Sequence, residues 1–97
     1  MKKHGLPDSI RVGGQVYQVR HDDDMAAEDG RYGLCNTRQL LIEIDGGSAP
    51  TRQHQTLIHE ALEAINCEYH AQLSHDQIEQ LEGALFALLR DNPGVFA

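Results

Sequence analysis

Three side chains that bind metals or transfer protons stand close together in the run His-Glu-Ala-Leu-Glu at residues 59–63. At about 100° per residue, Glu63 lies only about 40° around a helix from His59 and one turn along it, so both can contact one ion. Glu60 lies about 100° from His59, too far round to be an obvious ligand, yet within reach of a water beside the ion. We therefore expect His59 and Glu63 to bind a metal and Glu60 to act as the general base.

The alternative for such a pair is a surface hydrogen bond worth only about 0.2 to 0.5 kcal/mol. On this helix a polar stripe runs beside an apolar one, which favours a metal site over a surface hydrogen bond. The polar stripe comprises Arg52, Thr56, His59, Glu63, Asn66 and His70, and the apolar stripe comprises Ile58, Ala61, Leu62, Ile65 and Tyr69. His70 cannot join the site, because it lies roughly 16 Å along the axis from His59.

A third ligand must therefore come from a second helix, which offers His75, Glu79 and Glu82 along one flank. If the two helices form a hairpin that turns near Leu73, Glu82 lies beside the pair on the first helix. His75 is chemically the stronger zinc ligand. It comes within reach only if the first helix ends early, near Glu68, or if the helices cross steeply. Both residues remain candidates at this point.

The two helices are marked by their ends. The loop at residues 46–50 supplies Ser48 as a cap and Pro50 as a first-turn residue, so the first helix should run from there to about residue 70. Ser74 and Gln77 match a capping box at the start of the second helix, and the Asn-Pro-Gly run at 92–94 should end it. The expected buried stripe of this helix is Ile78, Leu81, Leu85, Leu88 and Leu89.

The N-terminal half has the alternation of strands. Residues 9–12 and 15–20 flank a Gly-Gly pair typical of a tight hairpin, with Ile10 and Val12 facing Tyr17 and Val19. Further strands are predicted at 32–35 and 39–45, the latter with Leu40, Ile42 and Ile44 inward, and an acidic solvated loop at 21–31. The fold class is therefore α+β: a small antiparallel sheet of three or four strands packed against two C-terminal helices.

Composition restricts the class of protein. A chain of 97 residues predicts a single domain over 1–97, with flexible ends at 1–8 and 94–97. The net charge of −7 disfavours nucleic acid and anionic membranes as partners. We find no apolar stretch of signal-peptide or transmembrane type, which predicts a cytoplasmic protein whose Cys35 and Cys67 are buried, reduced thiols.

The segment Thr-Leu-Ile-His-Glu-Ala-Leu-Glu-Ala-Ile at 56–65 resembles small phage and prophage proteins related to the ImmA/IrrE-like zinc metallopeptidases. The resemblance covers most of the chain, including Ile-Arg-Val-Gly-Gly at 10–14, Tyr-Gly-Leu-Cys at 32–35 and the close at 85–93. It implies bound zinc, or another divalent metal, with Glu60 activating the water. It also implies that His75 and Glu82 both belong to the site, one on the metal and one behind it.

The chain departs from the family motif at one ligand, because Glu63 stands where the second His of His-Glu-x-x-His belongs. The metal inference is therefore stronger than the peptidase inference. We expect hydrolysis of a peptide or related amide bond, with an extended peptide beside the strand at 39–45. The alternatives are a structural ion joining the helices of an interaction protein, or a metal-free accessory or inhibitor protein. The sequence leaves the substrate, the partner and the oligomeric state open.

Overall fold

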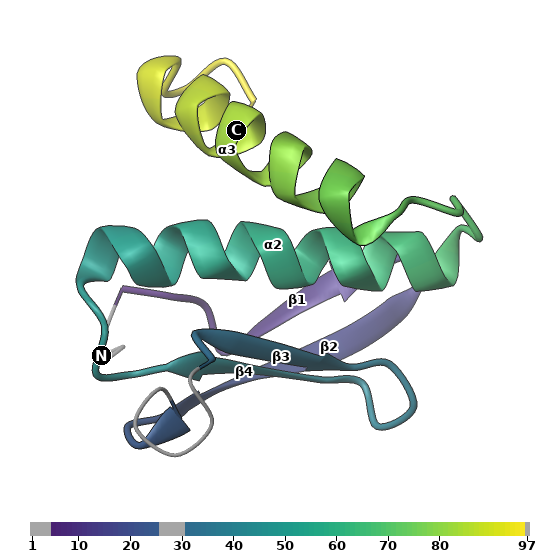
Figure 1. The fold of residues 1–97 in the computed structure, drawn as a ribbon, viewed down its shortest axis with the longest axis horizontal. Coiled ribbons are helices and arrows are strands. Elements are labelled where there is room, and N and C mark those ends of the chain that lie inside the picture. Colours follow the sequence, from purple (N-terminus) through teal and green to yellow (C-terminus); the bar gives the residue numbers. More distant parts are fainter. Residues whose placement is uncertain (1–4, 26–30, 97) are drawn as a thin grey trace.

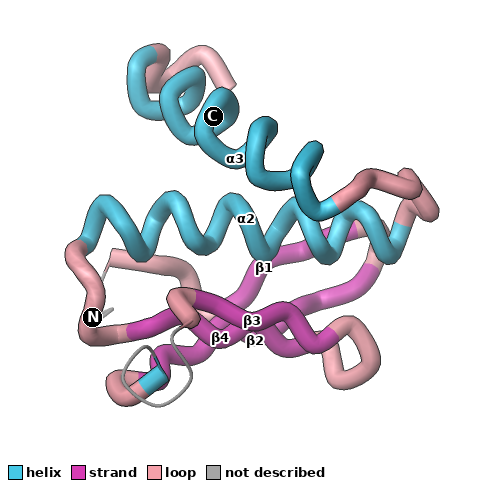
Figure 2. Tube along the Cα trace, in the orientation of Figure 1, coloured by secondary structure: helices cyan, strands magenta, loops and turns pink. Residues whose placement is uncertain are grey.

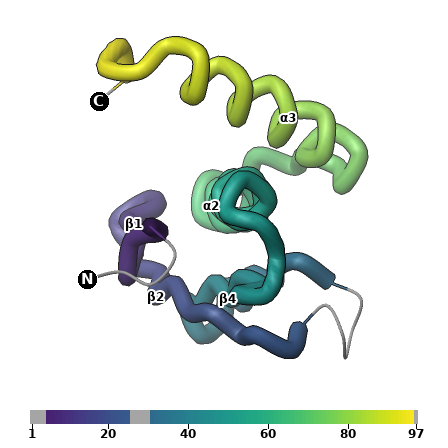
Figure 3. The backbone as a smooth tube through the Cα atoms, turned by 90° about the vertical axis from the view of Figure 1, so that its left-hand side faces the viewer, coloured from purple at the N-terminus to yellow at the C-terminus, as the bar shows by residue number. Residues whose placement is uncertain are grey.

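The computed structural model describes residues 5–25 and 31–96. Its elements form three layers, in which helix α2 (Pro50–Glu68) lies between a four-stranded sheet below it and helix α3 (His75–Asp91) above it (Figures 1 and 3). The four strands precede α2 and α3 along the chain, and both of these helices lie on one side of the sheet (Figure 2). The predicted α+β class, with the sheet in the N-terminal half and two C-terminal helices, is confirmed.

Strands β1 (Ser9–Val12) and β2 (Gln15–Asp22) form the predicted hairpin. Gly13 and Gly14 have φ angles of 58° and 87°, the left-handed values that a two-residue hairpin turn requires. Ile10 pairs with Tyr17, as the apolar pattern predicts. The Tyr17 hydroxyl donates to Oε2 of Glu68 at 2.6 Å, so the hairpin is fixed to the far end of α2.

Strands β3 (Gly33–Asn36) and β4 (Leu41–Asp45) pair antiparallel. In the turn between them, Asn36 Oδ1 accepts from the Gln39 amide, and Leu40 has a φ of 58°. Ile42 and Ile44 are fully buried, as their alternation predicts.

The strand order is β1-β2-β4-β3, and β2 pairs with β4 in parallel. The prediction of an entirely antiparallel sheet is therefore wrong for this pair. Although β3 follows β2 along the chain, it lies at an edge of the sheet, and β4 lies between β2 and β3. Because β4 is paired on both sides, a peptide cannot add beside it, and the expected peptide position at 39–45 is wrong. Among the described strands, β1 and β3 form the two edges of the sheet, and β3 is the edge strand beside His59 and Glu60.

The predicted acidic loop at 21–31 begins too early, because β2 continues through His21 and Asp22. Parallel pairing of these two residues with Ile44 and Asp45 extends the strand. Asp22 Oδ1 then accepts from the Asp24 amide at the start of the turn. The later part of this segment, residues 26–30, lies outside the described residues.

Helix α2 spans Pro50–Glu68, with Pro50 in its first turn as predicted. The cap prediction is wrong, because Ala49 is the N-cap and the Ser48 hydroxyl donates to the Asp45 carbonyl. The buried face also differs from the predicted stripe, since Ile65 and Tyr69 are 37% and 63% exposed. Small or polar side chains face the sheet instead and allow close approach of the helix. The buried residues of α2 are Gln53, Thr56, Glu60, Leu62 and Ala64.

Helix α3 spans His75–Asp91, and its capping box and its end before Pro93 are confirmed. Its predicted buried stripe is largely wrong: Ile78 is buried, but Leu81 and Leu88 are 39% and 43% exposed. The cause is the steep crossing of α2, after which the C-terminal half of α3 diverges from the rest of the molecule (Figures 1 and 3).

The hydrophobic core lies between the sheet and α2. It comprises Leu6, Val12, Tyr17, Val19, Ile42, Ile44 and Ala64. Both cysteines are free thiols, and the prediction that both are buried is wrong for Cys67, which is exposed. Within the described residues, neither helix combines the length and the hydropathy that crossing a bilayer requires.

Candidate metal centre

His59 and Glu63 lie one turn apart on the face of α2 that borders β3. His59 Nε2 is 3.5 Å from Glu63 Oε2, and both side chains are largely covered, with 17% and 32% exposed. The helical spacing alone brings these two groups together, as the sequence predicts.

His75, the first residue of α3, completes a group of three. Its ring centroid is 5.8 Å from that of His59, with the ring planes at 70°. One potential ligand atom from each of His59, Glu63 and His75 lies within 4.8 Å of the others. We call these three residues the metal group. Both conditions that could bring His75 within reach are met, since α2 ends at Glu68 and α3 crosses it steeply.

The linker between the helices places His75. Its residues His70 and Gln72 have φ angles of 51° and 58°, which turn the chain sharply after α2. The Asn66 side chain holds this turn, because its Nδ2 donates to the Leu73 carbonyl and its Oδ1 accepts from the Leu73 amide. His70 itself is exposed and stands outside the metal group, as expected.

Glu82 lies behind His59 rather than within the metal group. Its Oε1 is 2.7 Å from His59 Nδ1, and its Oε2 accepts from Gln55 Nε2 at 2.7 Å. A carboxylate bound to one ring nitrogen fixes the orientation of the imidazole and leaves the other nitrogen for an ion. This arrangement leaves His59 Nε2 on the side of Glu63.

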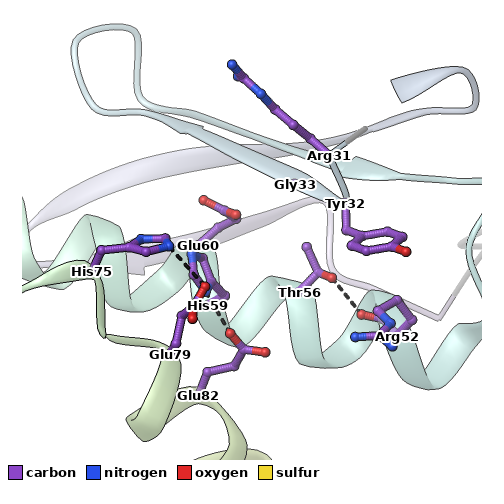
Figure 4. Close-up of a pocket in the computed structure, with 10 residues that line it drawn as sticks. All are labelled: Arg31, Tyr32, Gly33, Arg52, Thr56, His59, Glu60, His75, Glu79 and Glu82. Atoms are coloured by element: carbon purple, nitrogen blue, oxygen red, sulfur yellow. Dashed lines mark hydrogen bonds and ion pairs between the residues drawn. The ribbon is translucent and has the colours of Figure 1, made fainter. Parts of the chain in front are cut away.

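Glu79 is the remaining candidate on α3, and its Oε1 lies 2.9 Å from His75 Nε2. Both side chains are more than half exposed, so this contact contributes little to stability. Glu79 also lines the same cavity as His59 and His75 (Figure 4).

Glu60 points from α2 toward β3 and is only 6% exposed (Figure 4). Room for its carboxylate comes from Gly33: a Cβ atom there would lie 2.8 Å from Glu60 Oε2 and would also collide with Thr56. Gly33 is therefore part of the site, because almost any side chain at this position would displace Glu60.

Burial raises the pKa of Glu60 to about 7, and the carboxylates of Glu63 and Glu82 act in the same direction. For His59, burial lowers the pKa, but the hydrogen bond to Glu82 and the nearby carboxylates outweigh it and raise the pKa above its usual value. His59 and Glu60 therefore both hold a proton more strongly than the same side chains do in water. A buried carboxyl group with a pKa near neutrality is suited to proton transfer.

A cleft between β3 and α2 contains these groups. Two cavities, of about 440 and 510 Å³, are both lined by Gly33, His59, Glu60 and His75. The first extends toward Tyr32 and Arg52, and the second extends along β3. The metal group therefore lies near the middle of a cleft rather than at its end.

Sequence reasoning identified the residues of the metal group but not several that support it. Gly33 gave no signal beyond its place in a Tyr-Gly-Leu-Cys run, and Gln55 gave none at all. Asn66 belonged to the polar stripe, but its bonds to the linker could not be inferred without knowing where α2 ends.

No protein-family model, curated protein or solved structure matches this chain. The resemblance to the ImmA/IrrE-like proteins therefore remains a prediction from the motifs. The geometry of the site is the basis on which a function can be proposed.

Proposed function

We propose that this protein is a zinc-dependent hydrolase that acts on a peptide or related amide bond. The observation that carries the proposal is the meeting, in one cleft, of a three-residue metal group with a buried carboxylate, Glu60, that lies outside that group. A structural ion has no need of such a neighbour, whereas hydrolysis needs a group that accepts a proton from water.

The donor set supports zinc. With His75 as the third member, the group offers two imidazoles and one carboxylate, the set used by several zinc peptidases. If Glu82 were the third ligand in place of His75, the ion would instead have two carboxylate ligands, Glu63 and Glu82. Bound zinc would supply Lewis acidity and lower the pKa of a water to about 7.

The chain's own residues supply the rest of the chemistry. Glu60, buried beside the metal group, can accept a proton from the attacking water and pass it to the leaving amine. Glu82 keeps the His59 ring in one orientation. Gly33 lets β3 approach α2 closely enough to exclude solvent around Glu60.

The peptide would lie along the outer edge of β3, which replaces the predicted position beside β4. This edge is unpaired in the part of the chain that the structure describes, and the cleft follows it. Backbone hydrogen bonds to an edge strand are a common way to hold an extended peptide. The proposal places the reaction in the cytoplasm, where free thiols persist.

Metal analysis tests the first half of the proposal. We expect protein purified without added zinc to contain about one equivalent of zinc, and His59→Ala to lose it. His54→Ala is the matched control, because His54 is an exposed histidine on the same helix outside the metal group. Wild-type protein without stoichiometric metal, including after incubation with zinc, would refute the proposal.

Hydrolysis of a peptide mixture, followed by mass spectrometry, tests the second half. We expect Glu60→Gln to retain zinc and lose at least 100-fold in rate, roughly the contribution of a general base. Equal rates for Glu60→Gln and wild type would remove Glu60 from this role.

A structural ion is the second candidate, and one observation favours it. Within the predicted apolar stripe of α3, Ile78 is the buried residue, so this helix is weakly attached to α2. An ion bound through His75, together with His59 and Glu63, would strengthen that attachment. A structural site would be closed by a fourth protein ligand, while a catalytic site keeps a position for water. X-ray absorption of the zinc-loaded protein distinguishes the two by ligand count.

A further inference from the structure

Arg52 and Tyr32 form one end of the cleft. The guanidinium carbon of Arg52 lies 5.1 Å from the centre of the Tyr32 ring, and both residues line the same cavity as His59 (Figure 4). Arg52 stands on the polar stripe of α2, and Tyr32 directly precedes β3. The aromatic ring holds the flat guanidinium in place and leaves hydrogen-bond donors at its edge available.

The charge of Arg52 is not neutralised by a protein carboxylate within residues 5–25 and 31–96, where its guanidinium contacts the Tyr32 ring. The acidic side chains of the cleft gather around the metal group instead, at Glu60, Glu79 and Glu82. Arg31 lines both cavities, while Arg52 lines the first at its Tyr32 end. The cleft therefore has acidic side chains around the metal group and a guanidinium, that of Arg52, at one end.

The separation between these parts matches a short stretch of peptide. Arg52 precedes His59 by seven residues, or roughly 10 Å along the helix axis. An extended peptide advances about 3.3 Å per residue, so roughly three residues span this distance. A guanidinium with free donors binds carboxylates in preference to neutral groups, through two parallel hydrogen bonds.

We propose that the Arg52–Tyr32 end of the cleft binds a carboxylate of the substrate, about three residues from the bond held at the metal group. The substrate class is thus an acidic peptide, or a peptide whose own C-terminal carboxylate reaches Arg52. This inference rests on the proposed function for the reaction, but carboxylate binding can be measured without turnover.

The test uses zinc-loaded protein and alanine-based nonapeptides in matched pairs. One arm moves a single Glu or Gln through every position, and the other compares a free C-terminal acid with its amide. We expect kcat/KM to favour the carboxylate roughly tenfold at one position, as expected for one charge-assisted contact. The arm that shows the preference identifies the side chain or the terminus as the source.

Arg52→Gln should reduce that preference to below twofold, and Arg52→Glu should shift it toward Lys-containing peptides. Arg11→Gln, on β1, is the matched control and should keep the preference. Cleavage by the wild type with no preference in either arm, or an unchanged preference in Arg52→Gln, would overturn the inference and leave the proposed function standing.

If the wild type cleaves none of these peptides, the same pairs are compared by calorimetric titration. Tighter binding of the acidic member in wild type, lost in Arg52→Gln, supports the carboxylate site even though the proposed hydrolysis has failed. Equal binding of both members refutes the site.

Discussion

The two helices share the site but differ in how the fold holds them. Helix α2 lies against the sheet, with Ala64 in the hydrophobic core and the Tyr17 hydroxyl bound to Glu68. Helix α3 packs on α2 and buries Ile78, while Leu81 and Leu88 remain 39% and 43% exposed. Two members of the metal group, His59 and Glu63, are therefore on the helix that packs against the core, and the third, His75, is on a weakly packed helix.

The site residues therefore depend on different contacts for their positions. His59, Glu60 and Glu63 keep their positions through the fold of α2 itself. His75 and Glu82 instead depend on the linker bonds of Asn66 and on the Glu82–His59 contact. A bound ion would add to the contacts that hold α3, so metal and α3 should stabilise each other.

The largest effect is expected in the core beneath α2. Ile44→Ala should lower the free energy of unfolding by about 2 to 5 kcal/mol, because it opens a cavity at a fully buried position. Urea denaturation measures this. A loss below about 1 kcal/mol would contradict the view that the sheet and α2 form the stable part of the molecule.

Glu60 should make the metal-free protein less stable as the pH rises. Its folded pKa of about 7 exceeds the ordinary 4.5, so the native state holds the proton more tightly and loses stability between these values. Glu60→Gln should remove this loss and stabilise the metal-free protein at pH 8 by up to about 3 kcal/mol, with little change at pH 4.

Urea midpoints in the presence of a chelator, at pH 4 and pH 8, provide the comparison. The pKa of His59 is also raised, so His59 too makes the folded protein less stable as the pH rises. Wild type and variant must therefore be compared at each pH. An equal difference at both pH values would mean that the Glu60 carboxyl group is not responsible.

Zinc should stabilise the protein through His75. At a free concentration 100 times its dissociation constant, it should add about 2.7 kcal/mol to the free energy of unfolding. His75→Ala should abolish most of this gain, whereas His70→Ala, an exposed histidine of the linker, should keep it. Hydrogen exchange should show the added protection in α3. A full gain in His75→Ala would exclude α3 from the site.

The smallest effect is expected on the exposed face of α3. Leu88→Ser should change the free energy of unfolding by no more than about 0.5 kcal/mol, because Leu88 is 43% exposed. Thermal unfolding of wild type and variant checks this. A loss as large as that for Ile44→Ala would mean that α3 is covered by something in solution, and the comparison of the two helices would have to be revised.

Local chemistry in the sequence was sufficient for much of this structure. Gly13 and Gly14 specify the hairpin, and Ser74 with Gln77 specifies the start of α3. The pairing of His59 with Glu63 follows from helical geometry alone. Each of these features depends on residues fewer than five positions apart.

Features that depend on distant residues could not be predicted in the same way. The alternation of Ile42 and Ile44 is the same whichever strands flank β4, so it does not reveal the parallel pair with β2. The apolar stripe of α2 does not identify which neighbour it faces. The choice between His75 and Glu82 depended on where α2 ends, and two left-handed residues there, His70 and Gln72, are not of the types that signal a turn.

The position of β4 between β2 and β3 has a consequence for synthesis of the chain. The hairpin of β1 and β2 can form as soon as its residues leave the ribosome, but the next strand to emerge, β3, has no partner until β4 follows. β4 must then be inserted between two strands that precede it. The sheet is therefore completed in one late step, and α2 arrives directly afterwards to cover its apolar face, which shortens the time for which that face is open to aggregation.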